Sequence, residues 1–457
     1  MIRILTRGLI GISLVVATGM CQYVEDSVRV CGVAVGSLVH NSSAGVIYGC
    51  SEQADSCFTI SCASNQVIAR FGVSIPMYLA YNSLDNRAYL TQRTEGYDSV
   101  VVISGTTHQR IAAIPLLEAL RPVWNPDNDR LYVSMDEENR VAVIDCHTNT
   151  VLCEIPVGQG PNGLVLNRPH QKLYVQNWDG ESVSIIDLNT NQVIKTIAVG
   201  NVPESGCYVE SAGRFYCGAG NLIVAIDGAG DTVVGAVVRP VGTAFPAMVA
   251  VEELSLVLVA GYGTGDSVYA VDATRDSIIH AVGVNRTPGS LARGAASGLV
   301  YCGHGSDYVS ALTPNGSRVV ATMSVGQAPF CFASVPSLRR LYVGCLSSRY
   351  VYVIRDTASG IQEQPSFGRP AAAVQIRPNP FTRSVAIIWN AALRGGDVAH
   401  VYAQDGRSVR EARIPAGGTR WVWDGRDGSG TEVPAGVYTV ICAAGCRTMT
   451  ATLVKAR

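Results

Sequence analysis

The stretch KLYVQNWDGESVSIIDLNT, from Lys172 to Thr190, holds two short apolar segments, LYV and SIID, on either side of a polar turn. Apolar runs rich in Val, Ile and Tyr and bounded by Gly, Asn and Asp are typical of β-strands joined by tight turns. Close relatives of this stretch stand before and after it in the chain. Repetition of a supersecondary unit is the signature of a repeat architecture, and it decides the fold class here.

Two apolar anchors define the repeat. The first recurs at steps of 41 to 43 residues, at Tyr48, Tyr89, Tyr132, Tyr174, Tyr216, Leu258, Tyr301 and Tyr342. The second follows 10 to 14 residues later, at Ile60, Ile103, Ile144, Ile186, Ile226, Val271, Leu312 and Ile354. A segment such as IAVGNVP (197–203) and a further apolar stretch complete most units. Each unit therefore offers four short strands.

Four strands in a period of about 42 residues predict one blade of an all-β propeller. The runs are too short and too β-branched for helices, and a parallel β-helix would have a shorter period. Separate four-stranded domains would leave one sheet face uncovered, whereas blades around an axis cover each other. Eight anchor pairs favour eight blades, with a seven-bladed ring and one unit outside it as the alternative. Residues 27–33, SVRVCGV, are expected to supply the outer strand of the last blade.

The units resemble the YVTN-type propeller repeats of secreted bacterial and archaeal proteins. The segment from Leu173 to Pro203 is similar nearly position by position to the pattern LYVxNxxxxxVSVIDxxTNxVxxTIxVGxxP. The unit with Leu258 in place of Tyr departs most. The predicted propeller spans residues 21–364, and the Asp that follows several second anchors, as at Asp187, is expected to cap a turn.

The carboxy-terminal region follows different sequence rules. A linker is expected at 365–371 and a small Ig-like β-sandwich at 372–457, because strand signals alternate with tight turns. The region resembles the FlgD-type immunoglobulin-like domain and the sorting domains of the type IX secretion system, through PNPF (378–381), DGR (405–407), WDG (423–425) and VPAGVY (433–438). That resemblance implies a role in export or surface anchoring. A plain β-sandwich spacer is the alternative.

The amino terminus resembles a secretory signal. Arg3 and Arg7 precede an apolar run at 8–17 and then small residues, and the run is too short to span a bilayer. We expect a signal peptide at 1–20 and an extracellular or cell-surface location, with the periplasm as the alternative. A buried first strand and a lipoprotein acylated at Cys21 are further alternatives, although Met20 fits the latter poorly.

An oxidising location permits disulfides among the 14 cysteines. The pairs that would face each other across predicted hairpins are Cys50–Cys57, Cys146–Cys153, Cys207–Cys217, Cys331–Cys345 and Cys442–Cys446. Buried thiols are the alternative for about half of these cysteines. The chain has no C-x-x-C pair and no Cys/His cluster at zinc spacing, so no metal site is predicted.

Charge and motifs narrow the function. The 35 Lys and Arg residues nearly balance the 36 Asp and Glu residues, which gives no electrostatic reason to expect nucleic acid or an anionic membrane as a partner. Hydrophobic residues make up 47% of the chain, yet no second apolar stretch approaches a membrane span. Haem, nucleophile-elbow, Walker and H-E-x-x-H motifs are lacking, and the seven histidines occupy unequal repeat positions. We therefore expect no cofactor.

Candidate ligand-binding residues cluster in the loops between the second and third strands. They are Asp136, Glu137, Trp178, Asp179, Asp266, His304 and Asp307. An exposed Trp offers a stacking surface for a sugar or an aromatic group. Turn formation alone also favours Asp and Gly at such positions.

The leading hypothesis is a secreted or surface-displayed binding module for an extracellular ligand or protein, with the secretion or anchoring machinery contacting its tail. One alternative is a propeller enzyme, a lyase or quinone-type dehydrogenase with a site near Asp136, Trp178 and His304. Another is a structural component of the cell envelope.

Overall fold

The computed structural model describes residues 22–30, 32–94, 97–238, 244–263, 265–284, 287–357, 374–377, 381–389, 398–403, 408–415, 420–444 and 447–456. These residues form β-strands and short 3-10 turns, so the all-β prediction is confirmed. The predicted signal peptide at 1–20 and the predicted linker at 365–371 lie outside the described residues.

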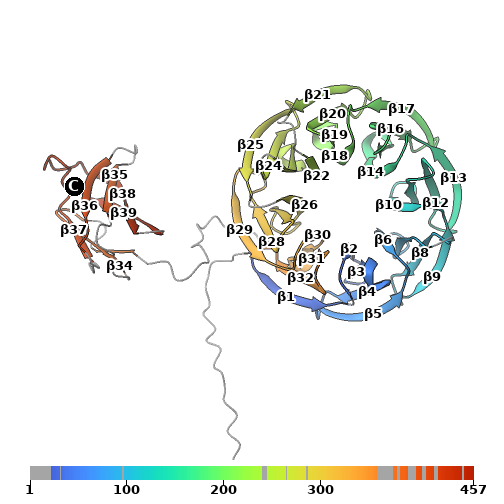
Figure 1. Cartoon of the computed structure of the whole chain (residues 1–457), viewed down its shortest axis with the longest axis horizontal. Helices are drawn as coiled ribbons and strands as arrows, with labels where there is room; N and C mark the ends of the chain where they lie inside the picture. Colours follow the sequence, from blue (N-terminus) through green and yellow to red (C-terminus); the bar gives the residue numbers. More distant parts are fainter. Residues whose placement is uncertain are drawn as a thin grey trace, which may run out of the picture. The chain divides into compact units, whose positions relative to one another are not determined.

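Eight antiparallel four-stranded sheets form a ring around a central axis (Figure 1). From the innermost to the outermost strand, the first four blades are β2 (Val35–Asn41), β3 (Val46–Ser51), β4 (Ser56–Ser61) and β5 (Gln66–Gly72); β6 (Pro76–Asn82), β7 (Arg87–Gln92), β8 (Ser99–Ser104) and β9 (Arg110–Pro115); β10 (Ala119–Asn125), β11 (Arg130–Met135), β12 (Arg140–Asp145) and β13 (Thr150–Pro156); β14 (Pro161–Asn167), β15 (Lys172–Asn177), β16 (Ser182–Asp187) and β17 (Gln192–Ala198).

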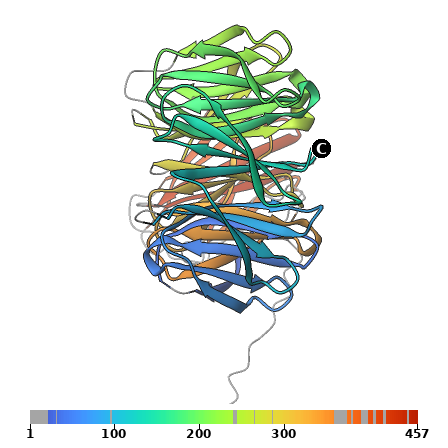
Figure 2. The same cartoon turned by 90° about the vertical axis from the view of Figure 1, so that its right-hand side faces the viewer.

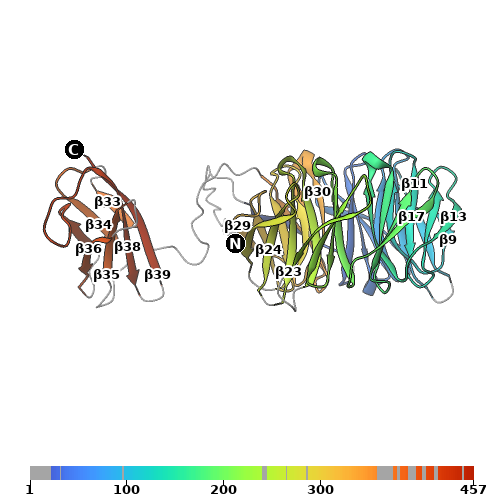
Figure 3. The same ribbon diagram turned by 90° about the horizontal axis from the view of Figure 1, so that it is seen from above.

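Blades 5 to 8 continue the ring in chain order. They are β18 (Pro203–Val209), β19 (Arg214–Ala219), β20 (Leu222–Asp227) and β21 (Val233–Val238); β22 (Ala244–Val251), β23 (Leu256–Tyr262), β24 (Ser267–Asp272) and β25 (Ser277–Gly283); β26 (Pro288–Arg293), β27 (Val300–His304), β28 (Tyr308–Leu312) and β29 (Val319–Ser324); β30 (Pro329–Val335), β31 (Arg340–Cys345), β32 (Tyr350–Arg355) and β1 (Val24–Arg29). The strands run between the two faces of the ring, as the edge-on views show (Figure 2, Figure 3).

The amino-terminal strand closes the ring. β1 is the outer strand of blade 8, where Val28 lies opposite Val351 of β32, and inner strands β30 and β2 contact each other. The eight-bladed prediction is therefore confirmed and the seven-bladed alternative is wrong. The strand covers Val24–Arg29 rather than the predicted 27–33, and it ends early because the chain turns toward β2 after Arg29, with Gly32 at a φ of 65°.

The repeated tyrosines join neighbouring blades. All seven anchor tyrosines, and Leu258 at the eighth position, are fully buried. Tyr132 OH donates to Asn191 Oδ1 of the next blade at 3.3 Å, and Tyr342 OH donates to Asn65 Oδ1 at 2.6 Å across the ring closure. Both acceptors adopt left-handed φ angles near 55°, which Asn tolerates. The anchor hydroxyls of Tyr132 and Tyr342 thus link their blades to the next blade in the ring.

The chain divides into two compact units, Met1–Gln362 and Glu363–Arg457. The second unit contains two antiparallel sheets: β33 (Val374–Arg377), β34 (Val385–Trp389) and β37 (Arg420–Trp423); β36 (Ser408–Arg413), β35 (Val398–Ala403), β38 (Gly436–Ala444) and β39 (Arg447–Lys455). Residues of both sheets, among them Ile387, Trp423 and Val440, belong to one buried cluster. A single shared core makes this unit a pair of packed sheets.

The ten described propeller cysteines, which include four of the five predicted disulfide pairs, are thiols in this structure. Cys153 lies opposite Val143 rather than Cys146. Cys207 lies opposite Tyr216, so Cys217, the residue after it, points to the other face of the sheet. These two pairs therefore cannot meet without a change of register.

The other three pairs differ in geometry. Cys331 lies opposite Gly344, which places Cys345 on the other face of the sheet. Cys50 lies directly opposite Cys57, so strand register does not separate this pair, and both residues are buried thiols in this structure. Cys442 lies opposite Met449, and Cys446 is outside the described residues.

Candidate functional site

Loops between the second and third strands share one face of the ring with the connections between blades. In blade 4, Trp178 N–H donates to Gly160 O at 2.8 Å and Gly180 N–H donates to Gln159 O at 3.0 Å. The opposite face carries the turns between first and second strands, including the 3-10 turns η2 (Arg168–His170), η3 (Glu210–Ala212), η4 (Glu252–Leu254) and η5 (Pro336–Leu338). A further 3-10 turn, η1 (Glu52–Ala54), lies on the first face.

The predicted loop residues do not form one site. Asp136 forms an ion pair with Arg93, which also lies 3.4 Å from Glu118, so this carboxylate serves an electrostatic contact between blades 2 and 3. Glu137, beside it, is exposed. Asp266 accepts a hydrogen bond from Thr287 N–H at 3.0 Å and so holds the turn into blade 7.

The remaining predicted residues are spread around the same face. Trp178 is 40% exposed, and Asp179 and Asp307 are exposed as well. His304 is buried, and its Nε2 lies 2.8 Å from Ser310 Oγ. Because Asp136 belongs to blade 3 and His304 to blade 7, they stand on opposite sides of an eight-bladed ring. The residues named for a propeller enzyme are therefore not brought together.

Acidic residues after the second anchors cap turns, as the repeat predicted. Asp187 Oδ1 accepts from Asn189 N–H at 2.7 Å, and Asp145 Oδ1 accepts from Thr148 N–H at 2.8 Å. The hydrogen bonds with Thr148 N–H lower the pKa of Asp145 and keep its carboxylate charged. These acids stabilise turns.

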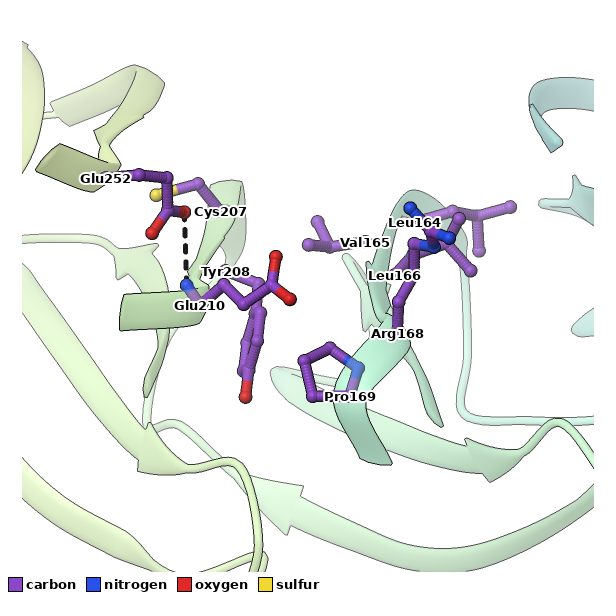
Figure 4. A pocket seen from close by; sticks show the side chains of 10 residues that line it. Leu164, Val165, Leu166, Arg168, Pro169, Cys207, Tyr208, Glu210 and Glu252 are labelled. Atoms are coloured by element: carbon purple, nitrogen blue, oxygen red, sulfur yellow. Dashed lines mark hydrogen bonds between the residues drawn. The ribbon is translucent and has the colours of Figure 1, made fainter. Parts of the chain in front are cut away.

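A cavity of about 340 Å³ opens between inner strands β14 and β18, on the face that carries the 3-10 turns. Inner strands surround the axis (Figure 1), so the cavity lies in the wall of the central channel at its mouth. Figure 4 shows the side chains of the two strands flanking the opening, with Glu210 and Glu252 across from Arg168. The lining residues are Leu164, Val165, Leu166, Arg168, Pro169, Gly206, Cys207, Tyr208, Glu210 and Glu252.

This channel-mouth cavity has an excess of negative charge. Arg168 is the one cation among the described lining residues, and its Nε donates to Asp127 Oδ2 at 3.0 Å, so it is already paired. Glu252 Oε1 accepts from Glu210 N–H at 3.1 Å and Glu252 Oε2 accepts from Ser211 N–H at 3.0 Å, which holds η3 in place (Figure 4). Within the described part of the chain, the Glu210 carboxylate has no ion-pair partner, and it is exposed at the rim.

Tyr208 completes the polar part of the wall. Burial first, and the Glu210 carboxylate second, raise the pKa of Tyr208, so its phenol stays protonated at neutral pH. Its hydroxyl lies 3.4 Å from His170 Nδ1. Three lining residues occupy the same position of the repeat, six residues before the anchors Tyr174, Tyr216 and Leu258. They are Arg168, Glu210 and Glu252. The sequence analysis missed them because it placed the binding face on the opposite loops.

A second cavity, of about 690 Å³, lies between blades 6 and 7. Its lining residues are Gly283, Val284, His304, Tyr308, Ser310, Val319 and Thr322. His304 and Ser310, 2% and 5% exposed, form its buried polar end, whereas Tyr308 is 39% exposed. Among the seven residues predicted to bind a ligand, His304 alone lines one of these two cavities.

Neither a cluster of metal-ligating side chains nor a membrane-spanning helix occurs among the described residues. Across those ranges, no three His, Cys, Asp or Glu side chains gather as a metal site would require. No helix within them is long and apolar enough to cross a bilayer.

Comparison with known proteins identifies the class of fold. No protein-family model matches the chain, and no curated protein matches it. The chain is similar to one in the crystal structure of the mitotic checkpoint complex, with 14% sequence identity and a TM-score of 0.53. That similarity covers 78% of this chain and 99% of the other. The protein is thus an eight-bladed β-propeller followed by a small unit of two sheets.

Proposed function

We propose that the protein is an interaction module that binds a basic segment of a partner protein at the channel-mouth cavity. The observation that carries this proposal is the unpaired Glu210 carboxylate beside an apolar wall. A Lys or Arg side chain suits such a surface, because its aliphatic stem packs on apolar residues while its charge reaches a carboxylate. The cavity is too small for a folded domain, so the recognised element is a side chain on an exposed segment.

Rigid surroundings support this role. η3 and η4 are linked through Glu252, and the wall residues belong to inner strands of adjacent blades, so the site is held before the partner arrives. A preformed site limits the entropy lost on binding. The similar chain from the mitotic checkpoint complex also belongs to a protein assembly.

Selection from a displayed random-peptide library on the immobilised protein tests this proposal. We expect the enriched peptides to carry Lys or Arg next to apolar residues. Glu210→Gln should lower the affinity of these peptides at least about tenfold, which corresponds to the loss of a charged hydrogen bond of about 1.5 kcal/mol. Glu138→Gln is the matched control, since Glu138 is an exposed carboxylate on the opposite face. Enrichment of acidic peptides, or equal binding by both variants, would contradict the proposal.

The location proposal is separate. We propose that this YVTN-type propeller is secreted or surface-displayed through its amino-terminal signal, and that the FlgD-type or type IX sorting-like tail serves export or anchoring. Charge and hydropathy of residues 1–20 support the first part, and the tail motifs support the second. Lys455 in the basic terminal sequence is buried and donates to Val433 O at 2.6 Å, so this residue belongs to the folded unit.

Fractionation of the producing cells tests the location. We expect the mature chain outside the cytoplasm, beginning after residue 20, and we expect deletion of 372–457 to leave it unexported or unanchored. A cytoplasmic chain with its first 20 residues intact would contradict this proposal and leave the binding proposal standing.

A further inference from the structure

We propose that the cavity between blades 6 and 7 binds a neutral sugar through Ser310, Thr322 and Tyr308. This inference is independent of the channel-mouth site, since the two cavities share no lining residue. A volume of about 690 Å³ falls in the range of small-molecule pockets.

Two hydroxyl side chains stand opposite each other on the cavity wall. Ser310 of β28 pairs in register with Thr322 of β29, so their Cβ atoms lie on the same face of the sheet. Ser310 is buried and contacts His304 Nε2 at 2.8 Å. Within the described ranges, the Thr322 hydroxyl has no hydrogen-bond partner, and the residue is exposed and lines the cavity. A hydroxyl both donates and accepts, so the pair suits two adjacent hydroxyl groups of a ligand.

The equivalent pair in blade 4 shows what is unusual here. Ser184 Oγ lies 3.2 Å from Thr196 Oγ1 and 2.9 Å from Asn177 Nδ2, and Gly158 N–H donates to Ser184 at 3.3 Å. Blade 4 therefore satisfies its hydroxyl pair internally. Blade 7 places the same pair against a cavity and leaves Thr322 to an outside partner.

Charge and shape narrow the ligand class. Among the described residues that line the cavity there is no carboxylate, Lys or Arg, so these residues offer a charged ligand no opposite charge in return for its lost hydration. Tyr308 is 39% exposed and supplies a flat apolar ring, and Val284 and Val319 supply the remaining apolar surface. Hydroxyl recognition beside an aromatic ring suits a sugar, whose ring has one polar edge and one apolar face.

Titration of the full chain with methyl glycosides of glucose, galactose, mannose and N-acetylglucosamine tests this inference, monitored by saturation-transfer NMR. We expect at least one glycoside to bind with a Kd in the millimolar range or below, about −4 kcal/mol. Thr322→Val and Tyr308→Ala should each weaken binding about tenfold, a loss near 1.4 kcal/mol. Both residues are exposed, so the variants should fold.

Thr196→Val is the matched control, because it removes the equivalent hydroxyl in blade 4 and should leave binding unchanged. Glu210→Gln should also leave it unchanged, which separates this site from the channel mouth. The inference is overturned if no neutral glycoside binds at up to about 50 mM, well above the expected Kd. Binding of glucuronate alone, or equal loss in Thr196→Val and Thr322→Val, would overturn it as well.

Discussion

Blades 4 and 7 have the same strand register but differ in how their polar interiors are satisfied. Ser184 lies opposite Thr196 in one blade, and Ser310 lies opposite Thr322 in the other. The end of the second strand holds Asn177 in blade 4, which is fully buried, and His304 in blade 7. Blade 4 pairs its two hydroxyls with each other, whereas blade 7 presents the equivalent pair to a cavity. A repeat therefore acquires a site through small departures from the shared pattern.

The two blades also hold their following neighbours differently. Lys172 of blade 4 lies 2.7 Å from Asp231 of blade 5, whereas blade 7 has Leu299 at that repeat position. Tyr301 of blade 7 instead donates to Asp356 of blade 8 at 2.8 Å. The contact between blades 4 and 5 thus includes an ion pair, whereas the contact between blades 7 and 8 includes a tyrosine hydrogen bond.

Lys172→Met should have the largest effect, because it leaves the Asp231 carboxylate without its cation. Both side chains are only 12% exposed, and loss of one partner of a buried pair costs about 3 kcal/mol. Urea unfolding of the full chain measures the change. Arg275→Met is the control, since that arginine is 76% exposed in its pair with Asp272 and should cost under about 0.5 kcal/mol. Equal losses would show that the Lys172 pair is not a structural joint.

Exchanging the residues at the ends of the second strands, Asn177 and His304, should cost more stability in blade 4 than in blade 7. Asn177→His should cost about 2 kcal/mol through overpacking, because a Cβ added at Gly158 would lie only 2.4 Å from Asn177 Nδ2. His304→Asn should cost under about 1 kcal/mol, since the smaller amide lies beside a cavity. Thermal unfolding of both variants tests this pair. Similar shifts in Tm would remove the distinction between a closed and an open blade.

Removal of the two anchor hydroxyls should rank next. Tyr301→Phe should cost about 1.5 kcal/mol, because it deprives the fully buried Asp356 of a donor. Tyr174→Phe should cost about 0.5 kcal/mol, since that hydroxyl accepts one bond from Asn167 at 3.3 Å. Urea midpoints of the two variants give the comparison. A larger loss at Tyr174 would mean that the contact between blades 7 and 8 does not depend on the Tyr301 hydroxyl.

Cys302→Val should have the smallest effect. Cys302 occupies the repeat position of Val175, and both are fully buried. Buried thiols behave as small apolar groups, so the change in unfolding free energy should be under about 0.5 kcal/mol. Burial also raises the pKa of Cys302, so alkylation of native protein at pH 8 should spare it. Alkylation before unfolding would show that the blade 6–7 interface opens.

Repetition explains why the fold could be predicted. Tyr132 and Tyr174 recur because each is buried between blades, and Asp187 recurs because it caps a turn. Asn191 is part of the Thr-Asn pair of the repeat pattern. Its role as the acceptor for Tyr132 could not be predicted, because Tyr132 belongs to the neighbouring blade. The cavities were not predictable for the same reason. Each lies between blades, so no single loop, such as that of Asp136, reveals which side chains share it.

Ring closure by β1 places a constraint on the order of assembly. The Gln22 side chain donates to Thr357 O, and the two residues are 335 positions apart in the chain. β1 therefore stays without its partner β32 until nearly the whole propeller has been synthesised. Before β1 and β32 pair, each has an open edge, and open strand edges are prone to pairing with other chains. We expect a chaperone or delayed folding to protect these edges. A circular permutant with new ends at a blade boundary should fold faster than the natural chain.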